Sequence, residues 1–226
     1  MHWLEKWIMP PTCVITGRAS EYLDLSQPLV EGWQVPLNVC PCCCEPSSLG
    51  LLCGACLTDP PAFDRTQAGF YFDKELVDLV HGLKYQRQLA YGRILADVLA
   101  ERLQTESVEA LLAVPLYAKR RRNRGYNQAE LIAQALSKKL QIPLLPAHAV
   151  QRIKDTPSQT HLDAQQRRRN LKGAFLVDNG SFEGLNQIAL IDDVITTGAT
   201  MQQLAKSIKT NTQIKTIQAW AVCKTK

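Results

Sequence analysis

Long apolar segments are missing from this 226-residue chain. No apolar run approaches the ~20 residues that a helix needs to span a bilayer. The first residues also lack the basic start and the long apolar stretch of a secretory signal peptide. We therefore predict a cytoplasmic protein with no membrane insertion.

Basic residues are scarce in the first part of the chain. Residues 1–64 contain two basic and seven acidic side chains, whereas residues 65–226 contain 24 basic and 14 acidic ones. A surface that binds nucleic acid needs Lys and Arg. This excludes the N-terminal part as a nucleic-acid-binding module, and we expect the basic C-terminal part to contact phosphates.

Seven of the eight cysteines lie before residue 57. They include two C-x-x-C pairs, and two such pairs can close a tetrahedral thiolate shell around zinc. Disulfides are disfavoured in a reducing cytoplasm, which leaves a metal as the better partner. Cys42 and Cys44 are rival ligands, and an iron–sulfur cluster is the less favoured alternative. We predict a small zinc-ribbon-like module with a structural Zn²⁺ held by Cys40, Cys43, Cys53 and Cys56.

Two consecutive prolines, Pro60 and Pro61, mark a boundary, because they stop regular structure. We predict an N-terminal segment with the zinc module at residues 1–62 and a second domain at residues 63–226. The expected strands of that domain lie at residues 69–72, 110–114, 174–177, 188–192 and 216–223, and the expected helices at residues 76–83, 95–103, 131–140 and 201–208. This alternation predicts an α/β fold with a mainly parallel sheet flanked by helices.

Residues 188–200 have the clearest chemical signal in the chain. Four apolar residues suit a buried strand, and Asp192 and Asp193 follow where that strand would end. A turn of Thr196, Thr197, Gly198, Ala199 and Thr200 then leads into an amphipathic helix. Backbone N–H groups at such a helix start bind anions, threonine hydroxyls add donors, and glycine permits close approach.

The two aspartates have a different expected task from the turn beside them. Carboxylates repel a phosphate but accept hydrogen bonds from vicinal hydroxyls such as those of a ribose. A helix cap needs one acid or hydroxyl, whereas this segment offers two acids and three threonines. The combined pattern predicts a site for a ribose 5-phosphate.

A second segment, residues 114–128, follows another buried strand and holds five basic residues within residues 119–124. We interpret it as a loop facing the same crevice as Asp192, because ligands of parallel sheets collect at the carboxyl ends of strands. Guanidinium, ammonium and backbone donors there would suit a pyrophosphate. A solvated basic face is the alternative. A third basic stretch, residues 152–172, fits either a mobile lid or an exposed loop.

These motifs follow one another in a fixed order. After the cysteine pairs and Pro60-Pro61 come Leu83-Lys84-Tyr85, Val114-Pro115-Leu116, Arg124-Gly125-Tyr126-Asn127-Gln128, Thr156–Thr160, Arg167–Phe175 and the Asp192-Asp193 segment. This order, from about residue 36 to the end, resembles the ComF/GntX family. Residues 188–200 also resemble the phosphoribosyl pyrophosphate signature of type I phosphoribosyltransferases. Thr16 departs from the family pattern, since other members often have a cysteine there that completes an additional knuckle.

The resemblance implies an N-terminal zinc module joined to a type I phosphoribosyltransferase-like domain. It implies that Asp192 and Asp193 bind the ribose hydroxyls of phosphoribosyl pyrophosphate and that residues 196–200 bind its 5-phosphate. It also implies a flexible loop near residues 156–169, and a link to natural competence, the uptake and handling of single-stranded DNA. The implied pyrophosphate loop comprises Pro115, Leu116, Tyr117 and Lys119, to which the basic run adds Arg124.

Two functions follow as hypotheses. The first is a Mg²⁺-dependent phosphoribosyltransferase in which an acceptor displaces pyrophosphate, with Mg²⁺ held mainly by substrate oxygens. No residue identifies the acceptor. The second is a non-catalytic sensor of phosphoribosyl pyrophosphate that binds single-stranded DNA through its basic C-terminal domain. In either case the zinc module is expected to be structural or to dock a protein of the competence machinery.

Overall fold

The computed structural model describes residues 12–20, 24–155 and 173–226. The expected flexible loop at residues 156–169 and the basic residues up to 172 lie outside these ranges. None of the helices described is long and apolar enough to cross a membrane.

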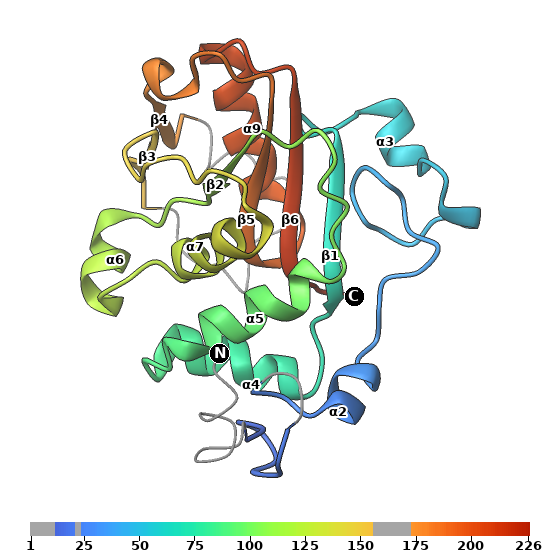
Figure 1. Ribbon diagram of the computed structural model, residues 1–226. Coiled ribbons are helices and arrows are strands. Elements are labelled where there is room, and N and C mark those ends of the chain that lie inside the picture. The colour runs from blue at the N-terminus through green and yellow to red at the C-terminus, as the bar shows by residue number, and fades with distance from the viewer. Residues whose placement is uncertain (1–11, 21–23, 156–172) are drawn as a thin grey trace.

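A four-stranded parallel sheet forms the centre of the molecule (Figure 1). Its strand order is β1 (Arg65–Tyr71), β6 (Thr216–Lys224), β5 (Gln187–Ile195) and β2 (Ala110–Ala113). A separate antiparallel pair joins β3 (Val150–Arg152) to β4 (Phe175–Val177). The predicted α/β class with a mainly parallel sheet is confirmed.

Helices cover both faces of this sheet. The helices described are α2 (Gln27–Glu31), α3 (Gly54–Thr58), α4 (Glu75–Tyr85), α5 (Ala90–Ala100), α6 (Ala118–Arg124), α7 (Gln128–Leu140) and α9 (Ala199–Asn211), with 3₁₀ turns at Ser48–Gly50 and Asn179–Phe182. On one face α4, α5 and α7 pack over the strands, and on the other α9 and the β3–β4 pair do so. Two hydrophobic cores therefore sandwich the sheet.

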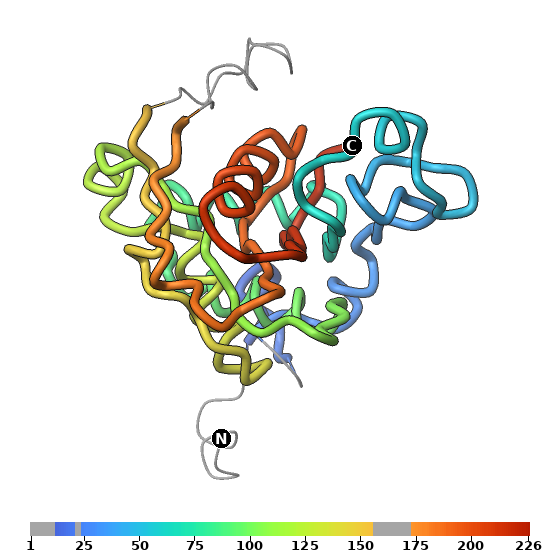
Figure 2. The backbone as a smooth tube through the Cα atoms, turned by 90° about the horizontal axis from the view of Figure 1, so that it is seen from above, coloured from blue at the N-terminus to red at the C-terminus, as the bar shows by residue number. Residues whose placement is uncertain are grey.

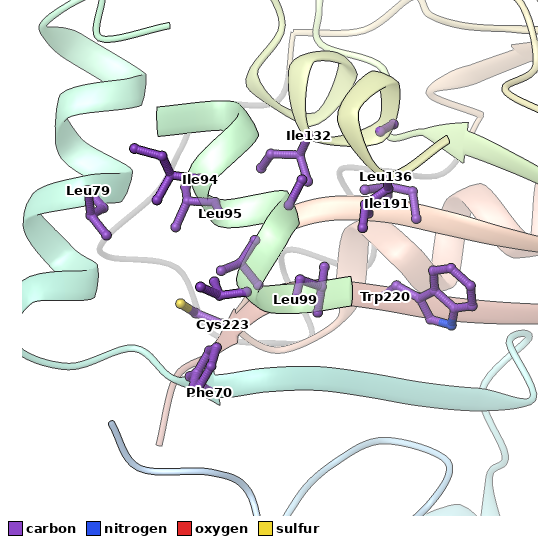
Figure 3. Close-up of a cluster of buried hydrophobic side chains, with 14 of the residues drawn as sticks. Phe70, Leu79, Ile94, Leu95, Leu99, Ile132, Leu136, Ile191, Trp220 and Cys223 are labelled. Atoms are coloured by element: carbon purple, nitrogen blue, oxygen red, sulfur yellow. The ribbon is translucent and has the colours of Figure 1, made fainter. Parts of the chain in front are cut away.

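The core under α4, α5 and α7 shows why helices form in these parts of the chain (Figure 3). Helices α4 and α7 include their predicted ranges, whereas α5 begins at Ala90 and ends at Ala100, earlier than the predicted range 95–103. Leu79 of α4, Leu95 and Leu99 of α5, and Ile132 of α7 are fully buried in this core. Each such side chain contributes about 2 kcal/mol through burial. Gly92 lets α5 approach α7 closely, because a Cβ there would lie 2.9 Å from the side chain of Leu131.

Strand β5 differs from its prediction in a way that concerns the site. The strand was expected to end at the two aspartates, yet it continues through both of them to Ile195. The reason is β6, which extends far enough to pair Asp192 with Ala221 and Val194 with Cys223. The acidic pair is therefore held on a hydrogen-bonded strand rather than on a loop.

The basic segment also differs from its prediction. Residues 118–124 were expected in a loop, but they form helix α6. Gly125 ends this helix in the left-handed region at φ +90°, a conformation that suits glycine. Asn127 then caps α7 by accepting a bond from the N–H of Ala129 at 3.1 Å, while its Nδ2 donates to the carbonyl of Val114 at 2.9 Å. The loop proper is limited to the residues between β2 and α6.

The cysteine-rich segment lies against the outer edge of β1, on the opposite side of the sheet from α6 (Figures 1 and 2). The N–H of Thr66 donates to the carbonyl of Pro41 at 3.0 Å, and the N–H of Tyr71 to that of Gln34 at 2.7 Å. These bonds cover an edge strand that would otherwise be open to pairing with another chain. The division of the chain between residues 62 and 63 stays a prediction.

Candidate functional site

Four cysteines meet in the N-terminal segment in the predicted combination. The Sγ atoms of Cys40, Cys43, Cys53 and Cys56 all lie within 4.8 Å of one another. Sulfur atoms around a tetrahedral zinc, with Zn–S bonds of about 2.3 Å, are spaced about 3.8 Å apart. The cluster thus has the donor type and the dimensions of a structural zinc site.

The rival cysteines have other surroundings. The thiol of Cys42 points to the carbonyl of Phe63, 3.6 Å away, and Cys44 is buried near Lys224 and the backbone of Ala68. Neither belongs to the group of four. The geometry therefore favours Cys40 and Cys43 over Cys42 and Cys44 as the metal ligands of residues 40–44.

Backbone donors stabilise the thiolate form of one cysteine of this cluster, Cys40. Burial raises the pKa of the Cys40 thiol, but bonds from the N–H groups of Cys43 and Cys53 outweigh it and lower the pKa to about 6. The bond from the N–H of Cys53 to the sulfur of Cys40 measures 3.4 Å. Thiolate is the metal-binding form, so these N–H groups favour the state that holds a metal.

The two aspartates of β5 have unequal environments. Asp193 is buried, and its Oδ2 forms an ion pair of 2.6 Å with Nζ of Lys84 at the end of α4. Asp192 remains half-buried, with part of its surface open. Burial and the adjacent charge of Asp193 raise the pKa of Asp192 well above its ordinary value. Asp192 is thus the acid of the pair that is open to a ligand.

Lys84 is held in place by both acids. Burial would lower the pKa of its ammonium group, but the charges of Asp193 and Asp192 outweigh burial, and the pKa is raised. The lysine therefore stays cationic and neutralises part of the charge of the acidic pair. Without this cation, two adjacent carboxylates in a partly buried strand would repel each other strongly.

The turn after β5 has the geometry of an anion site. Gly198 has φ +71° and opens the 13-residue helix α9, whose first N–H groups have no intrahelical partner. A Cβ at Gly198 would lie 3.7 Å from the ring of Phe63, and the left-handed conformation itself disfavours other residues. Thr196 and Thr197 are exposed beside it. The turn thus presents N–H and hydroxyl donors at the carboxyl end of the strand that carries Asp192.

Motifs distant in sequence converge on the Lys84 end of this site. The hydroxyl of Tyr126 donates to the carbonyl of Leu83, and the guanidinium of Arg124 lies over the ring of Tyr85, 5.5 Å from its centroid. The Leu-Lys-Tyr motif of α4 and the Arg-Gly-Tyr-Asn-Gln motif thus form one contact. Together they fix the position from which Lys84 reaches the acidic pair.

The proposed pyrophosphate segment follows β2, the edge strand farthest from β1 and the cysteine-rich segment. Pro115 and Leu116 line a cavity of about 540 Å³, with Arg121 and Arg152 also on its walls. Tyr117 immediately precedes α6, and Lys119 is exposed on that helix. The predicted residues of this segment therefore occupy one region, but they divide between a short loop and a helix.

Lys84 and Arg152 are functional candidates that the sequence marked only as members of larger segments, the Leu83-Lys84-Tyr85 motif and the basic stretch of residues 152–172. Burial and the nearby charge of Arg120 lower the pKa of Arg152, while Asp192 and Asp155 raise it. Arg152 thus lies within the electrostatic reach of Asp192. Lys84 also follows Val80 by one helical turn, at the border of a buried stripe, which is a second signal in sequence that could have marked it.

This fold and site define an α/β protein with a parallel sheet, an acidic pair near the carboxyl end of a central strand, and a four-cysteine metal-binding module. No family model matches the chain. Competence protein F of Haemophilus influenzae is 38% identical to it, over 76% of this chain and 78% of that protein.

Two further relatives are more distant. The DNA utilization protein YhgH of Salmonella typhimurium is 34% identical over 84% of this chain and 85% of its own length. Competence protein ComFC of Bacillus subtilis is 24% identical over 76% and 71%. The chain belongs to the ComF family, which confirms the resemblance that its motifs indicated.

Proposed function

We propose that this protein binds phosphoribosyl pyrophosphate at the carboxyl end of β5 and serves in DNA uptake or use. The observation that carries the proposal is the turn at Gly198, where a left-handed glycine opens α9 six residues after the half-buried Asp192 at the carboxyl end of β5. The N–H groups of α9 suit the 5-phosphate, and Asp192 suits the ribose diol. The role in DNA uptake is supported by the names of the relatives in Haemophilus influenzae and Bacillus subtilis.

The pyrophosphate group would lie toward the basic side of the site. Arg152 is near enough to Arg120 and to Asp192 for its charge to interact with both. Donors preorganised around a leaving pyrophosphate stabilise the charge that develops on it. Mg²⁺ fits this proposal through the oxygen of Asp192 together with substrate oxygens, the ligand type it prefers, and it would neutralise part of the pyrophosphate charge.

As an enzyme, the protein would transfer a phosphoribosyl group. The bond between ribose C1 and the pyrophosphate oxygen breaks with its electron pair on that oxygen, a bond from C1 to the acceptor atom forms, and the proton of the acceptor passes to the released pyrophosphate or to water. Asp192 would orient the ring, Lys84 would hold Asp193 in place, and the arginines would stabilise the departing pyrophosphate. Pyrophosphate release measured against a panel of nucleobases and amines would identify the acceptor.

Isothermal titration calorimetry with phosphoribosyl pyrophosphate and Mg²⁺ tests the binding site. We expect Asp192→Asn and Thr197→Val each to weaken binding at least tenfold, since each removes a direct partner of the ligand. Two matched controls, Glu183→Gln and Thr210→Val, change exposed residues outside the site and should leave affinity unaltered. No binding by the wild-type chain, or equal affinity in all variants, would refute the assignment.

A second candidate function is a non-catalytic sensor that also binds single-stranded DNA. It is favoured by the basic composition of α6. Two arginines of this helix already form ion pairs, Arg120 with Asp155 and Arg121 with Glu130. Lys119 and Arg122 are exposed and form no ion pair within the part of the chain described. Unpaired cations on one helix suit a phosphate backbone.

The salt dependence of oligothymidylate binding tests this role. The double variant Lys119→Gln/Arg122→Gln should weaken binding and make its salt slope shallower by about 1.4, at about 0.7 for each phosphate that the variant no longer neutralises. The control Lys206→Gln/Lys215→Gln removes two exposed charges elsewhere. A wild-type chain that binds no oligonucleotide at low salt would eliminate this candidate. We also propose that a protein of the DNA-uptake machinery docks on the cysteine module.

A further inference from the structure

One exposed aromatic ring stands out on the surface of this protein. Tyr85, the last residue of α4, is 69% exposed, and it is the one aromatic among the exposed large hydrophobic residues of the described ranges. In those ranges four rings have a cation over them, those of Phe70, Tyr71, Tyr85 and Phe175. The other three are buried or half-buried. Of the four, Tyr85 alone therefore combines a bound cation with an open ring.

Contacts on one face and at the edge hold this ring in place. The guanidinium of Arg124 lies over it, 5.5 Å from its centroid. The ring of His81 is nearly perpendicular to it, at an interplanar angle of 80° with 5.3 Å between the centroids. Arg124 is itself fixed by a hydrogen bond that it donates to Gln128. A ring held in this way loses little freedom when a second planar group stacks on it.

The end of α4 and the basic helix α6 form one continuous surface around this ring (Figure 1). The hydroxyl of Tyr126 donates to the carbonyl of Leu83, two residues before Tyr85, and Arg124 covers Tyr85 from the end of α6. The hydroxyl of Tyr126 is thus engaged with α4, and its ring is half-buried. Tyr85 is therefore the tyrosine of this surface that a ligand can reach.

The charges on this surface indicate what kind of ligand it suits. Residues 81–90 and 117–128, the two segments that meet at Tyr85, contain seven basic residues and no acidic one. Three of these cations are paired with acids from other segments: Lys84 with Asp193, Arg120 with Asp155 and Arg121 with Glu130. The other four form no ion pair within the part of the chain described: Arg87, Lys119, Arg122 and Arg124. Such cations beside an open aromatic ring suit a ligand that carries both phosphates and planar bases.

The strength of one stack decides between a free nucleotide and a strand. Stacking of a base on an aromatic side chain raises affinity by about 5- to 150-fold. A dissociation constant of 1 mM already requires about a thousandfold, so one stack on an open ring does not hold a free nucleobase. A strand adds the contacts of several phosphates to several cations, and the bases of a single strand are free to stack.

We infer that Tyr85 is the stacking platform for a base of single-stranded DNA whose phosphates contact the unpaired cations of α6. This inference rests on the second candidate function, and it adds the residue that receives a base. The base would lie on the ring face opposite Arg124, because the guanidinium occupies the other face.

Photo-crosslinking tests the inference in the wild-type chain. A set of oligothymidylates, each with 5-iodouracil at one position, is bound at low salt and irradiated, and the crosslinked peptides are mapped by mass spectrometry. We expect a crosslink at Tyr85. Crosslinks confined to other residues, or no crosslink from any strand that binds, would overturn the inference.

Three variants then measure what the ring contributes. Tyr85→Leu should weaken oligothymidylate binding at least fivefold without a change in its salt slope, because no phosphate contact is lost. Tyr85→Phe keeps the ring and should stay within twofold of the wild-type affinity. The matched control Tyr71→Leu removes a tyrosine of β1 that also has a cation over its ring, Nζ of Lys226 at 5.4 Å, and should leave the affinity unaltered. Melting temperatures verify that the variants fold, since exposed substitutions change stability little.

The possible results separate this inference from the function on which it rests. A wild-type chain that binds no oligothymidylate at low salt would overturn both. Binding that Lys119→Gln/Arg122→Gln weakens but Tyr85→Leu leaves unchanged would overturn the inference alone. Equal affinities for thymidine monophosphate and for the strand would also overturn it, since the site would then recognise a single nucleotide.

Discussion

The cysteine module and the proposed phosphate site are assembled in opposite ways. The four sulfur ligands come from residues 40–56, whereas the phosphate site joins Lys84 of α4, Arg152 of β3 and the β5–α9 turn. The first depends on local spacing and a metal, and the second on packing between distant elements. A metal ligand is therefore essential only to its module, while the residues that support the phosphate site also affect the stability of the whole body.

The largest effect is expected from a metal ligand. Cys43→Ser removes one donor of the shell, and a structural zinc contributes on the order of 10 kcal/mol of folding free energy to a small domain. We expect the module to lose its metal and its fold, as seen by elemental analysis and by proteolysis. Cys42→Ser is the control, since Cys42 lies outside the cluster, and should keep one metal per chain. Equal metal content in both variants would show that the shell is different.

Lys84→Met tests the other half of this comparison, because it should lower the stability of the α/β domain rather than that of the cysteine module. It leaves Asp193 buried without its cation, and breaking a buried ion pair in this way costs about 3–5 kcal/mol. Urea denaturation should show that loss in the free energy of unfolding. The double variant Lys84→Met/Asp193→Asn should recover most of it, because no unpaired charge remains. A loss below about 1 kcal/mol in the single variant would contradict the role of the pair.

Asp192→Asn should have a smaller and opposite effect on stability. Because the folded state raises the pKa of Asp192, it binds this proton more tightly than the unfolded state does. Stability therefore falls as pH rises from the ordinary carboxyl pKa toward the raised one. The variant should lose that decline and melt about 2–4 °C higher at pH 7, a gain of about 1 kcal/mol. A lower melting temperature, or a pH profile of stability equal to that of the wild-type chain, would contradict the raised pKa of Asp192.

Sequence reasoning predicted the parts of this protein that are encoded locally. The spacing of the C-x-x-C pairs predicted the four cysteines that cluster, with Cys42 and Cys44 as rivals, and helical spacing placed α4, α7 and α9. It failed where distant pairing decides the outcome. The end of β5 depends on how far β6 extends, and nothing within residues 188–200 reveals that.

The unequal aspartates illustrate the same limit. As adjacent identical residues, Asp192 and Asp193 look equivalent in sequence, and the difference arises from Lys84, more than a hundred residues earlier. Helix α6 was missed for a different reason. A run of adjacent basic residues has no apolar periodicity that could distinguish a helix from a loop.

A crystal structure of the chain soaked with phosphoribosyl pyrophosphate and Mg²⁺ tests the central claim most directly. We expect the 5-phosphate within hydrogen-bonding distance of the N–H groups of Ala199 and Thr200, and the ribose diol against Asp192. Clear density for the ligand at another place, or none near Gly198 at a saturating concentration, would contradict the proposed site.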